Sequence, residues 1–454
     1  MSRRAAPGDA ARRPSAAYGV PVGAGHGHGG GTTGRLQVGR GLRIAVLAPI
    51  LVCALLAGLG VLHWWPDQAR LHRAEGVVPV VASGVSVVHG ELLRVRPACT
   101  GAGGTACGDS SARVLDGRAA GTVTPISLTP DVVGTGLRRG DQVLLFDLTG
   151  TPEAAANGAF DFYRADRGSS LVWLAILFAV LVVLVAWRRG ALALVSLAFA
   201  ALVVLGFLIP ALLSGRPPVP VTLAASALML VVILYATHGP SLRTSVALLG
   251  ALVGLGLSAL FAWVGVIGAR LGGLGDDSAS LLTFNVGWVD VQQLVVASVI
   301  VAGLGTLNDV TVTQASAVWE LREASPEMPR RDLFRRAMRI GRDHVASTVY
   351  TLVFAYLGTA LVLLVAVQLY RSTASAFVTA EDVAEEVVRA LVGGIALVLA
   401  MPVTTGIAVL VAAAAQPMTR RAPAGPYRRS SSPRAAAAAS DPFRVLPRDP
   451  WDEA

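Results

Sequence analysis

The sequence predicts an all-α polytopic membrane protein with about eight transmembrane helices and a small β-rich domain after the first helix. Three observations lead to this fold class. Apolar residues make up 54% of the 454 residues and charged residues only 15%, and the mean hydropathy is +0.61, so a soluble globular chain is excluded. Apolar stretches long enough to cross a bilayer recur along most of the chain. One interval, residues 63–170, has short β-branched runs instead.

Eight apolar stretches are close to the roughly 20 residues that a helix needs to cross the hydrocarbon core. They are residues 44–62, 171–187, 191–213, 219–237, 245–269, 291–309, 345–369 and 390–415. Only Arg188, Arg189 and Gly190 separate the second stretch from the third, so these two are expected to form a tight hairpin. The first is expected to be an uncleaved anchor, because a long segment precedes it and no small-x-small cleavage site follows it.

The distribution of arginine predicts the orientation, because positively charged short loops stay in the cytoplasm. With the N-terminus inside, most arginines lie in the two tails, in the Arg188/Arg189 turn and in the loop 310–344. The short outside loops then carry only Arg216, Arg270, Arg371 and Arg389. We therefore expect a multi-pass protein of the bacterial plasma membrane with both termini in the cytoplasm.

Residues 63–170 are expected to form a small extracytoplasmic β-barrel or β-sandwich. Gly, Pro and Asp separate runs rich in β-branched residues at positions 77–88, 91–96, 113–115, 121–128 and 141–146. Cys99 and Cys107 fall in this domain, where they would either form a disulfide that closes a Gly-rich loop or remain free thiols. No His or carboxylate cluster accompanies them, so no metal site is expected.

The two tails, residues 1–43 and 416–454, are expected to be disordered, basic and cytoplasmic. Basic tails of this kind adhere to an anionic leaflet. A nucleic-acid partner would need a folded basic platform, and the sequence predicts none. The remaining residues 171–415 are expected to form a seven-helix membrane domain that contains the functional residues.

Two stripes of small and polar residues suggest where that function lies. On a helix, one stripe consists of Ser298, Ala302, Gly305, Asp309, Thr313, Ser316 and Glu320, and it is expected to pack on a partner helix. The next span carries a second stripe, formed by His344, Ser347, Thr348, Thr351, Ala355 and Gly358. If the stripes face each other, Asp309 and Thr313 lie near His344, Ser347 and Thr348 in a polar pocket close to the cytoplasmic end of the span.

Three interpretations of Asp309 remain open. The side chain would cap a helix at the membrane interface, or hydrogen-bond to hydroxyl groups of the partner helix, or bind a proton or cation. Ionisable groups inside spans are costly and tend to mark ion pathways. The surrounding hydroxyl groups and His344, whose type titrates near physiological pH, favour the third interpretation.

Residues 330–344 predict an amphipathic helix that lies on the cytoplasmic leaflet. Leu333, Phe334, Ala337, Met338 and Ile340 form its apolar face, and Arg331, Arg335, Arg336, Arg339 and Arg342 form its basic face. The basic face is expected to contact the membrane surface, and the alternative is a plain solvated helix in a loop. In the last span, Pro402 predicts a kink because it removes a backbone hydrogen bond.

Two segments resemble the signature of the YibE/F-like family of multi-pass bacterial membrane proteins. They are GLGTLNDVTVTQASAVWELREA at residues 303–324 and GRDHVASTVYTLVFAYLG at residues 341–358. The resemblance extends more loosely over residues 76–415, and Tyr350 departs from the small or polar residue expected there. It implies a polytopic membrane protein, described in some members as a permease.

The predicted function is permeation or transport of an unknown solute, coupled to protons at Asp309 with His344 nearby. The alternative is a membrane scaffold or assembly factor whose extracytoplasmic domain binds an envelope protein. The sequence contains no Walker loop, no HisGluXXHis and no GlyXSerXGly motif, so neither an enzyme nor a cofactor is expected. The expected partners are the lipid bilayer, a solute or ion, and an envelope protein.

Overall fold

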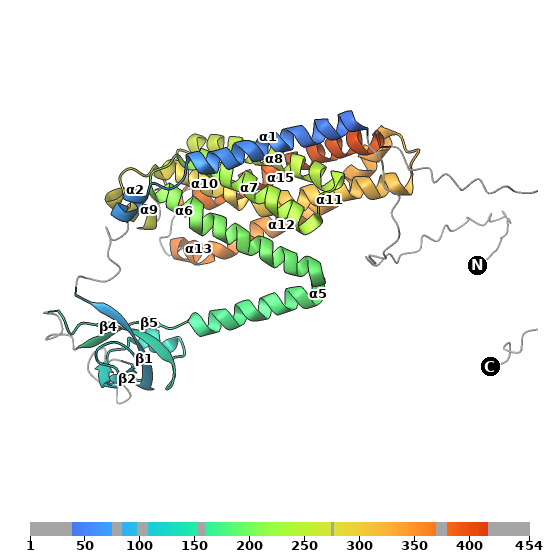
Figure 1. The fold of residues 1–454 in the computed structure, drawn as a ribbon. Coiled ribbons are helices and arrows are strands. Elements are labelled where there is room, and N and C mark those ends of the chain that lie inside the picture. The colour runs from blue at the N-terminus through green and yellow to red at the C-terminus, as the bar shows by residue number, and fades with distance from the viewer. Residues whose placement is uncertain are drawn as a thin grey trace, which may run out of the picture. The chain divides into compact units, whose positions relative to one another are not determined.

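The computed structural model describes residues 39–74, 84–97, 108–151, 159–273, 277–368 and 379–415. The strands form one small domain and the long helices form another part of the chain (Figure 1). Most of each tail lies outside the described residues, as do Cys99 and Cys107 with their predicted disulfide.

The β-rich domain is a single antiparallel sheet in the order β3-β2-β1-β4-β5. Its strands are β1 (Ser86–Arg94), β2 (Ser110–Val114), β3 (Val123–Ile126), β4 (Gln142–Asp147) and β5 (Phe160–Ala165), with the short helix α3 (Pro130–Gly134) before β4. Strand β1 pairs Gly90 with Val114 of β2 and Val88 with Leu145 of β4. The edge strands β3 and β5 contact each other, so the sheet curls into a half-barrel.

The core of this domain comes from alternate residues that point to one face of the sheet. The fully buried side chains include Leu92, Val114, Leu128, Val143 and Leu145. This confirms the β-rich prediction, with one curved sheet in place of a closed barrel or a two-sheet sandwich. Strand β5 was not predicted, because its sequence FDFYRA contains no β-branched residue.

Six helices of the described residues are long and apolar enough to cross a membrane. These six are α1 (Arg40–His63), the segment Gly168–Leu213, α7 (Pro218–His238), α8 (Leu242–Gly268), the segment Val291–Ala324 and α15 (Glu381–Ala413). Several apolar helices of this length establish a multi-pass membrane protein. The short helices are α2 (Gln68–Ala74), α9 (Asp277–Asn285) and α13 (Leu361–Gln368).

The predicted count of eight spans is not confirmed, for two reasons. The second and third predicted spans are joined in the 46-residue segment that runs from α5 (Gly168–Val203) through η1 (Val204–Leu208) to α6 (Ile209–Leu213). A bend at Trp187, whose backbone is non-helical at φ 51° and ψ −131°, interrupts α5 (Figure 1). The predicted span 345–369 is divided between α12 (Arg330–Thr359) and α13.

The amphipathic segment 330–344 is the first part of α12, which runs without a break into the predicted span. Leu333 and Ala337 are fully buried and belong to the same hydrophobic core as Trp319 of α11 (Leu304–Ala324). Protein therefore covers the part of the apolar face formed by Leu333 and Ala337, and for this part the expectation of contact with lipid is wrong. Ile340 of the same face is 44% exposed. Arg331, Arg335, Arg336 and Arg339 are exposed, and their contact with the membrane surface stays a prediction.

Helix α8 is packed closely against α15 and α11 through two glycines one turn apart. A Cβ on Gly250 would clash with the hydroxyl of Thr404 and lie 2.9 Å from both carbon atoms of its branched end. A Cβ on Gly254 would lie 2.7 Å from Leu307 and 3.1 Å from Ala400. This GlyXXXGly contact lets the helix backbones approach in the manner typical of membrane helices.

We expect Gly250→Ala to destabilise the protein by about 1–3 kcal/mol, because the new methyl group would lie 2.9 Å from the Thr404 Cβ, which a change of side-chain rotamer does not move. The control is Gly256→Ala on the same helix, where a Cβ would have no neighbour within 4 Å. Since alanine favours a helix over glycine, this variant should gain up to about 1 kcal/mol. Thermal unfolding in detergent measures both. Equal effects of the two substitutions would contradict the packing described here.

The β-rich domain contains a hydrogen-bonded pair whose stability depends on pH. The Asp116 carboxylate accepts from the His89 backbone N–H at 2.7 Å and lies 2.6 Å from His89 Nδ1. The side-chain hydrogen bond from His89 lowers the pKa of Asp116 below its usual 3.8. The folded state is therefore favoured by the charged carboxylate above pH about 4 and loses this contribution as the pH falls through the lowered value.

We expect Asp116→Asn to increase hydrogen exchange at the His89 amide at neutral pH, because the neutral side chain is a weaker acceptor. Exchange mass spectrometry of the peptide around residues 86–94 measures this effect. At a pH below the Asp116 pKa the variant and the natural protein should agree. A difference that persisted there would show that the effect does not come from the charge.

Candidate functional site

The structure brings Asp309 of α11 and His344 of α12 together. The carboxylate Oδ2 lies 3.2 Å from the imidazole Nε2, within ion-pair distance once the ring is protonated. The imidazole nitrogen is buried and has no hydrogen bond with correct geometry among the described residues. The Asp309 side chain is 60% exposed and that of His344 is 27% exposed. The pair is thus open on the aspartate side and enclosed on the histidine side.

The packing of α11 on α8 gives the level of the pair along the helices. Leu307 packs on Gly254, which is at the midpoint of α8. Asn308 and Asp309 follow Leu307 directly, so they lie within about one helical turn of that midpoint. Asp309 therefore lies at the level of the middle of α8, which is long and apolar enough to cross a membrane.

The stripe of small and polar residues from Ser298 to Glu320 was predicted to pack on a partner helix, but it is not the buried face of this segment. Residue Gly303 separates α10 (Val291–Ala302) from α11, so the stripe is not on one continuous helix. The buried face of α11 consists of Leu307, Val310, Thr311, Gln314, Ala315, Val318 and Trp319. Gly305, Asp309 and Glu320 are exposed on the other side. Apolar residues at spacings of three and four residues decide which face is buried, and these lie opposite Asp309.

The second predicted stripe is only partly correct. Thr348 is buried and its hydroxyl donates to the His344 carbonyl at 2.9 Å. Ser347 is exposed, because the buried face of α12 follows Leu333, Ala337, Gly341, Thr348 and Leu352. The predicted place of Ser347 beside Asp309 stays a prediction. Thr313 is half-buried one turn after Asp309.

A second polar contact, which the sequence did not indicate, lies one to two turns further along α11. Gln314 is fully buried, and Thr405 of α15 lies with its hydroxyl 3.0 Å from the Gln314 Oε1. The Gln314 Nε2 has no hydrogen-bond partner among the described residues and packs on Gly341 of α12. The signal in the sequence was a single amide within an apolar face, but only the structure shows which helices meet there.

The Thr405 hydroxyl also donates to the Met401 carbonyl at 2.8 Å, within α15. A hydroxyl has one hydrogen, so it cannot donate to Met401 and Gln314 at once. If the Gln314 amide is turned the other way, its NH2 group donates to the Thr405 hydroxyl, and that hydroxyl keeps its bond to Met401. At Pro402, where the sequence predicts a kink, α15 continues as one helix from Glu381 to Ala413.

Further polar side chains lie on α8, α10 and α15, on the opposite side of Asp309 from Gln314. Arg389 forms an ion pair with Glu386 and donates to Ser298 of α10 at 3.2 Å. Arg389 was expected in an outside loop, but it lies within α15. The Ser258 hydroxyl of α8 is buried beside Gly303, without a hydrogen-bond partner in the part of the chain that the structure describes.

The cavities of the described helical part include the following two. A small one of about 10 Å³ is lined by His238, Arg243, Thr244, Ala247, Val312 and Ser316, and its walls are mostly apolar. The apolar groove, about 400 Å³ in volume, is lined by Leu208, Leu212, Thr222, Leu294, Ala297, Ser298, Val301 and Ala302. The described residues contain no group of three His, Cys, Asp or Glu side chains placed to hold a metal ion.

Comparison with known proteins gives one match. A family model described as YibE/F-like protein matches residues 174–414, more than half of the chain. The matched residues include both α11 and α12, whereas the β-rich domain lies outside the match. No curated protein and no solved structure matches the chain.

We expect the Gln314–Thr405 contact to be energetically coupled. Thr405→Val leaves a buried amide without its partner and should cost about 1–3 kcal/mol. Adding Gln314→Met removes the amide as well and should restore most of that loss, because an apolar pair of similar shape needs no hydrogen bond. Thermal unfolding of the two single variants and the double variant gives the coupling energy.

The control is Thr359→Val, because this exposed hydroxyl makes a similar bond within its own helix, to the Tyr356 carbonyl. Its effect should stay within about 0.5 kcal/mol. If the double variant lost as much stability as the sum of the single variants, Gln314 and Thr405 would not be coupled.

Proposed function

The chain belongs to the YibE/F-like protein family, and from this premise we propose that it is a proton-coupled solute permease of the bacterial plasma membrane. Asp309 and His344 carry the proton. Both termini face the cytoplasm, as the arginine distribution predicts, and the protein moves its solute without chemical change.

One observation carries the proposal. A carboxylate and an imidazole lie 3.2 Å apart at the level of the α8 midpoint. An ionisable residue at that depth is costly, so it is expected on an ion or proton pathway. Imidazole can take and release a proton near neutral pH. A proton can then pass between the two groups without either charge crossing the hydrocarbon alone.

The exposure of Asp309 supports a pathway more than a structural role. A structural carboxylate in lipid would be enclosed by donors, but this side chain is 60% exposed and faces away from the buried side of α11. A charged group cannot face acyl chains without a large cost. We infer that this face of α11 borders a water-filled space or a further protein surface.

The packing of the three helices suggests which element moves. Helices α8 and α15 pack closely at Gly250 and Gly254. At Gly341, by contrast, α12 contacts α11 and α15 through two flexible side chains, Gln314 and Met401. A shift of α12 on that contact changes the distance between Asp309 and His344. Alternating access through such a shift requires no change in the α8–α15 pair.

Proton movement in proteoliposomes tests the proposal. Vesicles that contain the pH indicator pyranine are given panels of amino acids, sugars, nucleosides and metal ions under an imposed pH gradient. At least one solute should drive proton movement with the natural protein. Asp309→Asn should reduce that movement to the leak of protein-free vesicles, because an amide cannot take up the proton.

Asp343→Asn is the matched control, since Asp343 is exposed next to His344 on the same helix, and it should keep the natural rate. His344→Gln should resemble Asp309→Asn. If no solute in the panel moves protons and an envelope protein co-purifies through residues 64–170, the scaffold alternative replaces the permease.

A further inference from the structure

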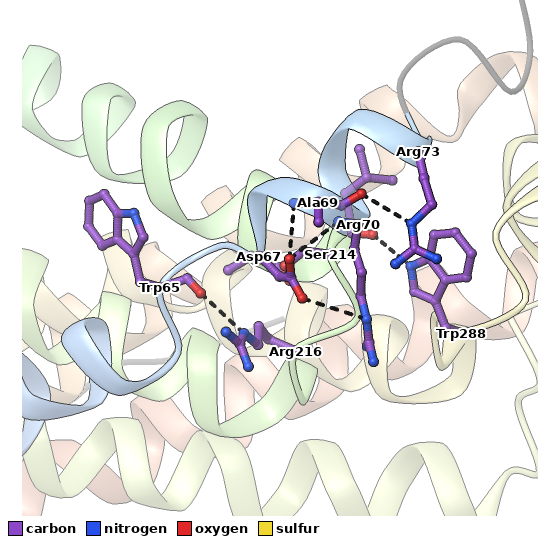
Figure 2. Close-up of polar contacts among 10 residues, drawn as sticks. Trp65, Asp67, Ala69, Arg70, Arg73, Ser214, Arg216 and Trp288 are labelled. Carbon is purple, nitrogen blue, oxygen red and sulfur yellow. Dashed lines mark hydrogen bonds and ion pairs between the residues drawn. The ribbon is translucent and has the colours of Figure 1, made fainter.

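A cluster of arginine and tryptophan side chains lies at the end of the helical part where α1 ends and α7 begins (Figure 2). Arg70 and Arg73 come from α2, and Arg216 comes from the segment between α6 and α7. Trp65 and Trp288 lie beside them and are 51% and 39% exposed. Arginine together with exposed tryptophan is typical of the boundary between lipid headgroups and acyl chains.

Several contacts hold this cluster in place. The Asp67 carboxylate accepts from the backbone N–H groups of Ala69 and Arg70 at 3.0 and 3.3 Å, which fixes the start of α2. Arg216 Nε donates to the Trp65 carbonyl at 3.1 Å (Figure 2). Trp288 Nε1 donates to the Leu213 carbonyl, also at 3.1 Å.

Gly215 allows α2 and the Trp288 loop to approach each other. Its φ of +78° suits glycine, and a Cβ there would lie 2.7 Å from Trp288 Cδ1 and 3.2 Å from Arg70 Nη1. Arg73 lies 5.9 Å from the centre of the Trp288 ring. The arginines are thus held on a packed platform and not on a loose loop.

The cluster carries more positive than negative charge. Asp67 is engaged by the α2 backbone and lies 3.8 Å from Arg70 Nε. Arg73 and Arg216 have no carboxylate partner among the described residues and bond only to backbone carbonyls through Nε. Their remaining N–H groups have the planar, fixed geometry that suits phosphate oxygens, and arginine stays charged at all relevant pH values.

The apolar groove defined above begins next to this cluster. Leu212 on one wall precedes Leu213, the residue that binds Trp288. Leu294 on the other wall lies in the first turn of α10, shortly after Trp288 in the chain. From there the groove continues along α10 to Ala302, about 12 Å further into the helical part. It therefore runs from the predicted headgroup level toward the middle of the membrane.

Thr222 supplies a polar group at an intermediate depth. It lines the groove, is fully buried, and its hydroxyl has no hydrogen-bond partner among the described residues. It lies about 6 Å beyond Pro218, the first residue of α7. This is the depth expected of the ester groups that connect a phospholipid headgroup to its chains.

We propose that this end of the protein binds one anionic phospholipid. Arg73 and Arg216, with Arg70 beside them, hold the phosphate. The Thr222 hydroxyl donates to an ester carbonyl, and one acyl chain fills the apolar groove. An anionic headgroup is favoured over a zwitterionic one because the three arginines would repel an ammonium group, and the oxygens of Asp67 are already engaged. The proposal does not depend on transport by Asp309 and His344.

Native mass spectrometry of the full chain in detergent tests the proposal, with phosphatidylglycerol or phosphatidylcholine of the same acyl chains added in turn. Phosphatidylglycerol should bind with an affinity at least roughly tenfold higher, because it brings a net negative charge to the two uncompensated arginines, whereas the choline ammonium of phosphatidylcholine cancels the charge of the same phosphate. The variant Arg70→Gln/Arg73→Gln/Arg216→Gln should lose this preference. The variant Arg118→Gln/Arg138→Gln/Arg139→Gln, which removes the same charge from exposed positions of the β-rich domain, should keep it.

A third variant tests the groove separately. Ala302→Leu narrows it without a change of charge, so binding of both lipids should weaken while the preference remains. The lipid proposal is overturned if the natural protein binds both lipids equally, a result that does not depend on whether any variant folds. It is also overturned if inorganic phosphate displaces phosphatidylglycerol at millimolar concentration, because the cluster would then bind free phosphate.

Discussion

The close contact of α8 with α15 and α11 is the interaction on which the rest of the helical part depends. In lipid there is no hydrophobic force between helices, so packing and hydrogen bonds must hold them together. Gly250 and Gly254 provide the packing by meeting Thr404, Ala400 and Leu307 at van der Waals distance. The contact sets the level of Leu307, and with it the depth of Asp309. It also brings α15 to the position from which Thr405 reaches Gln314.

This dependence explains which features were accessible from the sequence. Hydropathy and runs of β-branched residues depend only on local sequence, so the membrane class and the β-rich domain were predicted correctly. The buried face of α11 depends on its neighbours, and a stripe of small residues gave the wrong answer because Asp309 lies opposite Gln314 and Val318. His344 and Asp309 lie on consecutive helices joined by a short connection. Their proximity could therefore be predicted from the order of the helices in the chain. The count of eight spans is not confirmed, because two predicted spans are joined in one bent segment and a third is divided between α12 and α13.

Other features follow from contacts between distant segments, and no local pattern indicates them. Thr405 and Gln314 are 91 residues apart, and the arginine cluster joins residues near 70 to Arg216 and Trp288. The apolar face of residues 330–344 illustrates the same limit. Its pattern predicted burial correctly, but a pattern alone cannot say whether lipid or protein provides the cover, and here Trp319 of the preceding helix belongs to the same core.

The bend in α5 has a consequence for how the chain fits a bilayer. A straight helix of 46 residues would be about 69 Å long, more than twice the thickness of the hydrocarbon core. The bend at Trp187 divides it into two arms, and a side chain on Gly190 would press against the Val182 carbonyl group across the bend. Glycine at 190 therefore sets how sharply the arms can fold. A larger residue would open them toward a rod that no membrane of ordinary thickness could accommodate.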